Sequence, residues 1–211
     1  MGQFPDKIAI RQTLNLLLPE VPIGDETVEK ISLYTREITR WNKRINLTGA
    51  KTPQQFVEGP LFDALTFIPI MDGRGTLVDM GSGGGLPGIP AAILVPEVQV
   101  TLVEPRAKRT SFLRHALHLL NLESEVVEAR DDALGGRRWD GAVAQAVWPA
   151  REWLQRAVNT VKRGGAIHTL TSESVAELSL PEGLILEEER HVVRPSDGAP
   201  RYSARIRIYE Q

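Results

Sequence analysis

The stretch Val78–Pro90, which reads VDMGSGGGLPGIP, decides the fold class. Four glycines fall within residues 81–85, directly after the short apolar run TLVDM and shortly before another apolar run. Glycine permits positive φ and lets another molecule approach the backbone closely, at a cost in conformational entropy. The pattern therefore predicts a strand-to-helix turn that holds a ligand at the carboxyl end of a parallel strand. A tight turn without a ligand is the alternative.

Length and composition indicate one α/β domain with a small appendage. The chain has 211 residues, a formal net charge of −2 and no cysteine, which excludes disulfides and thiolate metal sites. No apolar run approaches the roughly 20 residues that span a bilayer, and the N-terminus lacks the layout of a secretory signal. We therefore expect a cytoplasmic monomer without a metal ion, and no more than a local basic face for nucleic acid.

Strand and helix patterns alternate after Gly75. The sequence predicts strands at 76–80, 98–104, 125–129, 140–147 and 166–171, a helix starting near Pro87, and helices at 108–120 and 150–161, the last closed by Gly164 and Gly165. This alternation predicts a doubly wound, mostly parallel sheet.

Both ends of the chain differ from this pattern. Helices are expected at 6–18 and 25–47, which makes 1–72 a helical N-terminal cap on a domain at 73–211. Segments 184–193 and 202–210 are expected to pair as a C-terminal antiparallel hairpin. In its second strand Ser203, Arg205 and Arg207 alternate with apolar residues and are expected to face solvent. The whole outline is typical of class I, Rossmann-like methyltransferase domains.

Two cofactor classes require such a glycine turn, the nicotinamide dinucleotides and S-adenosylmethionine. The dinucleotide fingerprint GxGxxG can be read over Gly83–Gly88, but it then begins four residues after Asp79 and includes a proline in the phosphate loop. Read from Gly81, the stretch is DxGxGxG, and Leu86 takes the place of the third dinucleotide glycine. This register favours S-adenosylmethionine, which has no pyrophosphate.

Acidic residues at strand ends fit this ligand. Asp79 is placed to serve near the ammonium group, directly or through water. Glu104 ends the second strand 25 residues later, where an acid can accept the ribose hydroxyls, although a surface glutamate is the alternative. Asp131 and Asp132 follow the third strand and are expected to contact the adenine, or else to cap a helix.

Three ordered segments carry a family resemblance: RWNKRINLTGAKTPQQF at 40–56, VDMGSGGGLPGIPAAILVPE at 78–97 and TLVEPRAKRTSFLRHALHLLNLE at 101–123. The chain resembles, from about residue 30 onward, the RsmG (GidB) methyltransferases, which methylate N7 of a guanine in bacterial 16S ribosomal RNA. The resemblance implies S-adenosylmethionine as cofactor and places contacts on Gly81, Leu86, Asp131, Asp132 and Gln145. With the residues chosen above, the predicted cofactor set is Asp79, Gly81, Gly83, Gly85, Leu86, Glu104, Asp131, Asp132 and Gln145.

The chain departs from the family pattern on the expected substrate side. Gln145 stands where the family has an arginine, Thr171 where it has a lysine, and Pro60 where it has a histidine. A homologue that binds the cofactor or its product without methylating ribosomal RNA is therefore an alternative, and so is an enzyme with another substrate. A nicotinamide oxidoreductase is a more distant one.

Guanine N7 is an acceptor without a proton, so its methylation requires no general base, and no catalytic residue is predicted. The expected partner is ribosomal RNA or the small ribosomal subunit. Phosphate contacts are expected at Lys108 and Arg109, and Trp148 is a candidate for base stacking unless it packs the start of a helix. A further basic set surrounds Trp41 on the second helix: Arg36, Arg40, Lys43 and Arg44.

Overall fold

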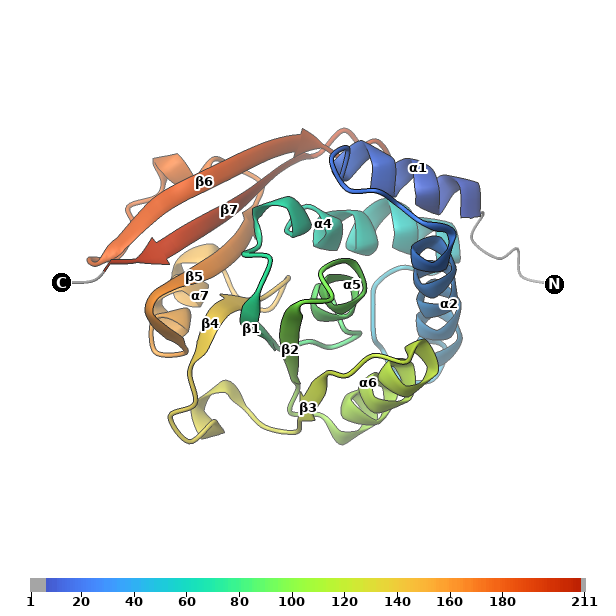
Figure 1. Cartoon of the computed structure of the whole chain (residues 1–211), viewed down its shortest axis with the longest axis horizontal. Helices are drawn as coiled ribbons and strands as arrows, with labels where there is room; N and C mark the ends of the chain where they lie inside the picture. Colours follow the sequence, from blue (N-terminus) through green and yellow to red (C-terminus); the bar gives the residue numbers. More distant parts are fainter. Residues whose placement is uncertain (1–6, 210–211) are drawn as a thin grey trace.

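Apolar strands buried on both faces build the parallel part of the sheet. In the computed structural model, which describes residues 7–209, seven strands hydrogen-bond in the order β3-β2-β1-β4-β5-β7-β6 (Figure 1). β1 pairs in parallel with β2 on one side and β4 on the other, so the winding reverses there, where α/β sheets bind ligands. The parallel strands are β1 (Gly75–Met80), β2 (Val98–Val103), β3 (Glu125–Val127), β4 (Trp139–Val143) and β5 (Val161–Thr171).

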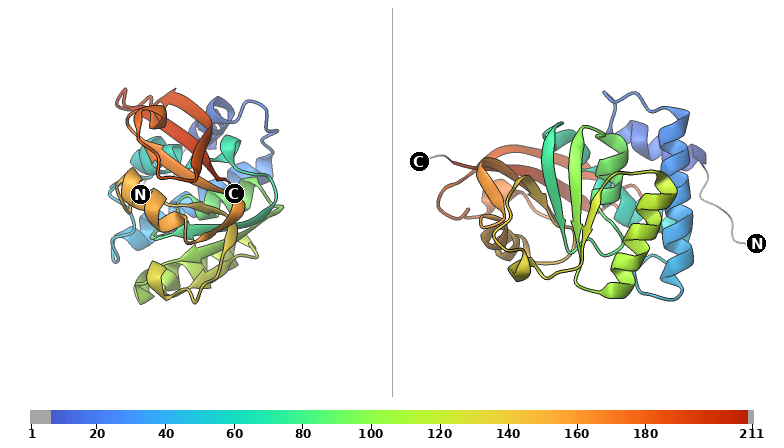
Figure 2. Two further views of the ribbon diagram at one scale, coloured as in Figure 1. Left: turned by 90° about the vertical axis from the view of Figure 1, so that its left-hand side faces the viewer. Right: turned by 60° about the horizontal axis from the view of Figure 1, so that its bottom comes forward.

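Helices cover both faces of this sheet, which confirms the predicted doubly wound fold (Figure 2). On one face α5 (Gly88–Leu94) and α6 (Ala107–Leu120) bury Ile89 and Leu113 against Leu77. On the other, α7 (Ala150–Ala157) buries Trp153 against Val78 and its neighbours. Successive side chains of β1 therefore point to opposite faces of the sheet and pack into two separate hydrophobic cores.

The N-terminal helices extend the first of these cores. Ile31, Tyr34 and Ile38 of α2 are fully buried and belong to the same apolar cluster as Leu113 of α6. The predicted boundary between residues 72 and 73 stays a prediction. The elements before β1 are α1 (Lys7–Leu17), α2 (Asp25–Asn42), α3 (Pro53–Phe56), η1 (Val57–Leu61), α4 (Phe62–Leu65) and η2 (Ile68–Ile70). Among the described residues, no helix is long and apolar enough to cross a membrane.

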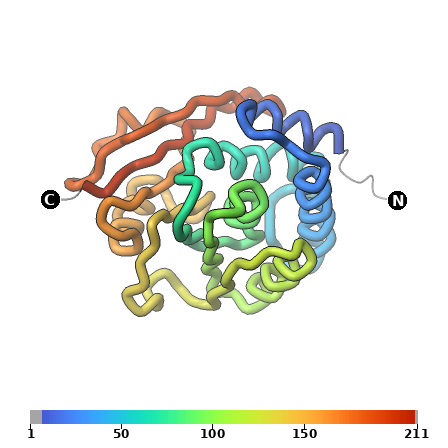
Figure 3. Tube along the Cα trace, in the orientation of Figure 1, coloured from blue at the N-terminus to red at the C-terminus, as the bar shows by residue number. Residues whose placement is uncertain are grey.

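The C-terminal hairpin pairs as predicted, β6 (Leu184–Val193) with β7 (Pro200–Ile208), and its turn reaches the neighbourhood of α1 (Figure 3). The expected solvation of the polar face of β7 is wrong. Ser203 is buried and donates to the Thr66 carbonyl at 3.0 Å, and Arg205 donates to the Ile70 carbonyl at 3.0 Å. The segment from α4 to η2 covers this face because its free carbonyls need donors.

Three predicted boundaries are also wrong. α2 ends at Asn42, not residue 47, because the Asn42 side chain binds the backbone of the following loop. α7 ends at Ala157, and Gly164 and Gly165 lie inside β5, where a Cβ on Gly165 would stand 2.5 Å from the Asp140 carbonyl. β4 stops at Val143, which leaves residues 144–147 in a loop.

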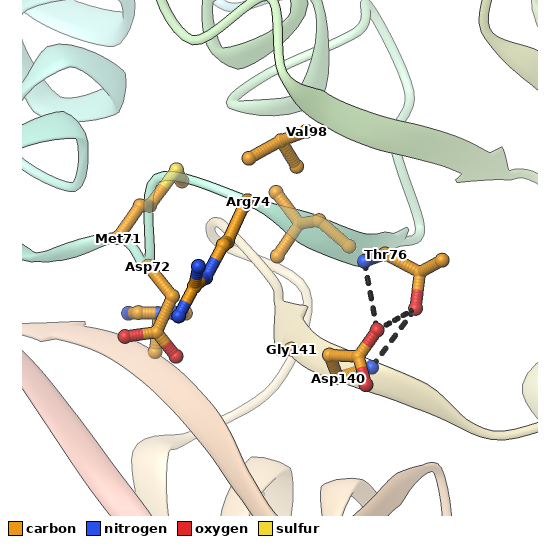
Figure 4. A pocket seen from close by; sticks show the side chains of 9 residues that line it. Met71, Asp72, Arg74, Thr76, Val98, Asp140 and Gly141 are labelled. Carbon is orange, nitrogen blue, oxygen red and sulfur yellow. Dashed lines mark hydrogen bonds between the residues drawn. The ribbon is translucent and has the colours of Figure 1, made fainter.

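The amino ends of β1 and β4 are closed by hydrogen bonds (Figure 4). Thr76 donates to Asp140 Oδ2 through its backbone nitrogen at 2.9 Å and its hydroxyl at 2.6 Å. A cavity of about 10 Å³ lies beside this pair, and His168 is one of its walls. The His168 imidazole is buried, which lowers its pKa to about 4, and its Nδ1 has no partner among the described residues. The candidate site lies at the opposite, carboxyl edge of the sheet, where the glycine turn follows β1.

Candidate cofactor and substrate site

Backbone geometry requires three of the four glycines in the turn after β1. The turn folds back on β2, since the nitrogens of Gly81 and Ser82 both donate to the Val103 carbonyl, at 2.8 and 3.0 Å. Gly81, Gly83 and Gly85 then take φ values of +71°, +54° and +90°. Residues with a Cβ avoid this region, so the predicted turn is confirmed in its backbone.

Two other glycines are needed because protein atoms, not a ligand, approach them. A Cβ on Gly84 would lie 2.7 Å from Ile38 Cδ1, and one on Gly88 would lie 2.2 Å from Leu102 Cδ2. Gly83 is different: the nearest atom to its Cβ position is 3.6 Å away. The bare backbone with open space at its Cβ position is therefore Gly83, in the early part of the turn, because the same position on Gly81 is taken by Val147.

Two buried carboxylates flank this turn. Asp79 is completely buried; its Oδ2 accepts from the Gly88 nitrogen at 3.0 Å, and its Oδ1 has no partner within residues 7–209. Burial raises the pKa of Asp79 to about 8. Glu104 is 2% exposed and accepts from the nitrogens of Gly83 and Arg106, each at 3.0 Å. A carboxylate has about four acceptor sites, so both groups keep unused capacity.

The N-terminal helix α2 fixes the turn from outside, a role that the sequence reasoning missed. The buried Tyr34 hydroxyl donates to the Gly84 carbonyl at 2.6 Å. Asn42 accepts from the nitrogens of Leu47 and Thr48, at 2.7 and 3.0 Å, and donates to two further carbonyls. In the sequence, only the family resemblance of the Trp-Asn motif indicates that this segment matters. In the structure, Asn42 holds the loop that packs on Gly84.

The loop after β4 approaches the turn from the other side. Val147 is the residue that a Cβ on Gly81 would strike, at 2.8 Å. Ala146 adopts φ +55°, an unusual conformation for alanine that often marks functional sites. Gln145 donates from Nε2 to the Pro60 carbonyl at 2.9 Å, while its buried Oε1 has no partner among the described residues. Two of the chain's departures from the family pattern thus contact each other.

One arginine contacts both Asp131, the first residue of the acidic pair after β3, and the tryptophan after β4. Arg156 of α7 binds Asp131 Oδ2 at 2.5 Å and lies 5.1 Å from the ring centroid of Trp148. Trp148 also stacks on Trp153 with the ring centroids 5.8 Å apart. This supports the packing alternative for Trp148. Asp132 is exposed and lies 3.9 Å from the Arg130 guanidinium.

The predicted RNA contacts differ in their surroundings. Lys108 is exposed, whereas Arg109 donates to the Asn46 carbonyl at 2.8 Å and lies 3.6 Å from Glu104, so it ties the α2 loop to the site. Arg201 of β7 is bound to Asp63 at 3.0 Å. Within residues 7–209 no three acidic or histidine side chains gather closely enough to hold a metal ion.

The architecture and the position of this site at the carboxyl edge of the sheet are those of the class I methyltransferase fold. Solved structures with the same fold include a methyltransferase from Pyrococcus furiosus, with a TM-score of 0.56, 14% identity and coverage of 86% of this chain and 98% of that chain. TrmN from Thermus thermophilus gives a TM-score of 0.55 and 20% identity, over 75% of this chain and 54% of that chain.

Sequence comparisons identify the family. A family model described as "rRNA small subunit methyltransferase G" (GidB) matches residues 27–184. Proteins named ribosomal RNA small subunit methyltransferase G are similar to the chain: 31% identical in Neisseria gonorrhoeae (strain NCCP11945), over 81% of this chain and 89% of that protein, and 32% in Stenotrophomonas maltophilia (strain K279a), over 92% and 98%. The chain belongs to this methyltransferase family, which confirms the resemblance read from the sequence.

Proposed function

We propose that this chain transfers a methyl group from S-adenosylmethionine to N7 of a guanine in 16S ribosomal RNA, as a cytoplasmic monomer. The single observation that carries the proposal is the positive-φ turn at Gly81 and Gly83, set between the buried carboxylates of Asp79 and Glu104 at the carboxyl edge of the sheet. Family membership supplies the ribosomal RNA as substrate.

The residues present fit this cofactor. Asp79 Oδ1 is buried without a partner among the described residues. The raised pKa of about 8 keeps Asp79 protonated at neutral pH in the free chain. The ammonium group of the methionine part would favour the ionised form and would then bind to Asp79, directly or through water. Glu104 has free acceptor sites for the ribose hydroxyls. Gly83 leaves room above its backbone, and Leu86 lies at the far end of the turn. Asp131 and Asp132 lie after β3 and stay the predicted adenine contacts. When bound, the cofactor supplies an electrophilic methyl group.

The chemistry then requires orientation more than proton transfer. Guanine N7 carries a lone pair and no proton, so the protein has to align N7 with the methyl carbon and exclude competing water. Holding two reactants in line can supply several kcal/mol, up to about 7–11 in model reactions. The loop of Gln145 to Trp148 is placed for this, because Val147 covers Gly81 and Gln145 is fixed by Pro60.

A cofactor-binding homologue without methyl transfer is the second candidate. Gln145 and Thr171 favour it, because each replaces a family cation with a neutral side chain, and Gln145 is engaged by Pro60.

One experiment separates the candidates. Small subunits and 16S ribosomal RNA from cells lacking this protein are incubated with the wild-type chain and labelled cofactor, and the RNA is analysed by mass spectrometry. Methyl incorporation at one guanine N7 supports the proposal. Tight cofactor binding with no incorporation into either substrate would favour the second candidate. Sedimentation of the wild-type chain tests the monomer.

A further inference from the structure

A large groove lies outside the site described above. It has a volume of about 980 Å³ and is lined by residues of α1, the second half of α2, the segment from residue 51 through η1 and the β6–β7 turn. Figure 1 shows the β6–β7 turn next to one end of α1. Ser196 of that turn donates to the Glu58 carbonyl at 3.1 Å and so bounds one end of the groove. None of the predicted cofactor residues lines it.

The lining of the groove is strongly basic in a chain whose net charge is −2. Four cations line it against one carboxylate, Glu58. Arg40 binds Glu37 Oε2 at 2.5 Å, but the side chains of Lys43 and Lys51 are exposed and have no ion pair or hydrogen bond with any described residue. The four cations are Arg36, Arg40, Lys43 and Lys51.

The cations are arranged as a row rather than a point. Arg36 and Arg40 of α2 and Lys43 at its C-cap follow one another at helical spacing, over a length of about 10 Å. A row of positive charge complements a polymer with regularly spaced phosphates better than a single anion. Leu16, which is 60% exposed, adds apolar surface on the α1 side of the groove.

The groove adjoins the substrate side of the site. The short helix η1 separates the two: Val57 and Glu58 line the groove, while the carbonyl of Pro60 accepts from Gln145 Nε2. The separation is therefore about the width of one helix, roughly 10 Å. A strand that leaves the target guanine can cross η1 and enter the groove.

We propose that this groove binds the phosphate backbone of the RNA segment next to the methylated nucleotide. The identity of the RNA rests on the proposed function. The location of its binding site rests on the row of cations, the unpaired lysines and the position of the groove beside η1. Phosphate contacts position a substrate without reading its sequence, so the groove contributes affinity and orientation, while the base is handled at the glycine turn.

The test compares two double variants that lose the same charge. Lys43→Gln/Lys51→Gln removes the two unpaired groove lysines, and Lys7→Gln/Lys30→Gln removes two lysines of α1 and α2 that do not line the groove. Binding of an unmodified 16S RNA transcript is measured over a range of salt concentrations, alongside S-adenosylhomocysteine affinity and methyl transfer. The cofactor product reports on the glycine turn alone.

The groove variant is expected to lower the slope of log affinity against log salt by about 1.4, or about 0.7 for each lost single-strand contact. Extrapolated from 1 M salt, this corresponds to roughly 25-fold weaker RNA binding at 0.1 M. S-adenosylhomocysteine affinity should match wild type in both variants, and the control variant should keep the wild-type salt slope.

The remaining outcomes are distinguishable. Equal RNA affinity and slope in the two double variants would overturn the groove proposal while leaving methyl transfer intact. A reduced salt slope of RNA binding in the groove variant, together with no methyl transfer by the wild type, would support RNA binding in the groove and refute the proposed function. Weaker binding to assembled small subunits only, with the transcript unaffected, would overturn it in favour of an acidic protein partner. A change of oligomeric state would overturn it in favour of a second copy.

Discussion

Replacing Gly85 with alanine should destabilise the chain by about 2–5 kcal/mol. Gly85 has φ +90°, a conformation that costs a residue with a Cβ about 1–2 kcal/mol. The new Cβ would lie 2.4 Å from Ile89 Cδ1 and 3.2 Å from Leu113 Cδ2. Both side chains are fully buried, and forcing a methyl group into such packing typically costs about 1–3 kcal/mol.

Urea unfolding measures this cost, with Gly135→Ala as the matched control. Gly135 also has positive φ, +62°, but no atom lies within 4 Å of its Cβ position, so only the backbone cost of about 1–2 kcal/mol should appear. In the Ile89→Val background, which lacks Cδ1, Gly85→Ala should cost less than in wild type. Equal destabilisation by Gly85→Ala and Gly135→Ala, with no coupling to Ile89, would refute the reasoning.

Three further predictions concern groups around the sheet. Asp79→Asn should have a higher free energy of unfolding than the wild type, and the difference should grow by roughly 1.4 kcal/mol per pH unit from pH 4 to 8. The reason is that the folded wild-type chain holds the Asp79 proton up to its pKa of about 8, whereas the unfolded chain does not. As the pH falls from 6.5 to 4, the free energy of unfolding of His168→Gln should rise relative to that of the wild type by about 3 kcal/mol. Burial lowers the His168 pKa to about 4, so the unfolded state takes up the proton at a higher pH than the folded state does. The two effects oppose each other in wild type, so each is measured as a variant-minus-wild-type difference in urea titrations, and a pH-independent difference would contradict it. Ala146→Gly should stabilise the chain by about 0.5–1 kcal/mol at unchanged m-value, because glycine relieves φ +55°; a lower urea midpoint would contradict this.

Local patterning was enough to predict the sheet. The alternation of apolar strands and helices from Gly75 onward predicted a mostly parallel sheet, and the Asp79-to-Gly85 spacing predicted the turn, because both are properties of short segments. The hairpin was predicted for the same reason. The burial of Ser203 was not, since it depends on the carbonyls of a segment more than 130 residues away.

The site was predicted in position more than in contacts. Strand-end logic correctly brought Asp79 and Glu104 to the turn, but Tyr34 and Asn42 act through partners that no local pattern reveals. The sequence also did not reveal that the glycines have different structural reasons. Gly84 and Gly88 lack a side chain because α2 and β2 pack directly against them. Trp148 was expected as either a stacking or a packing residue, and only its contacts with Trp153 and Arg156 show the packing.

The central claim is that the bare backbone at Gly83 receives the cofactor, and calorimetric titration with S-adenosylhomocysteine tests it most directly. The wild-type chain and Gly135→Ala should bind one equivalent. Gly83→Ala places its Cβ 3.6 Å from the nearest protein atom, so it should stay folded. It should bind about tenfold more weakly, which corresponds to a loss of about 1.4 kcal/mol. A folded wild type that gives no heat, or a Gly83→Ala variant with undiminished affinity, would contradict the account.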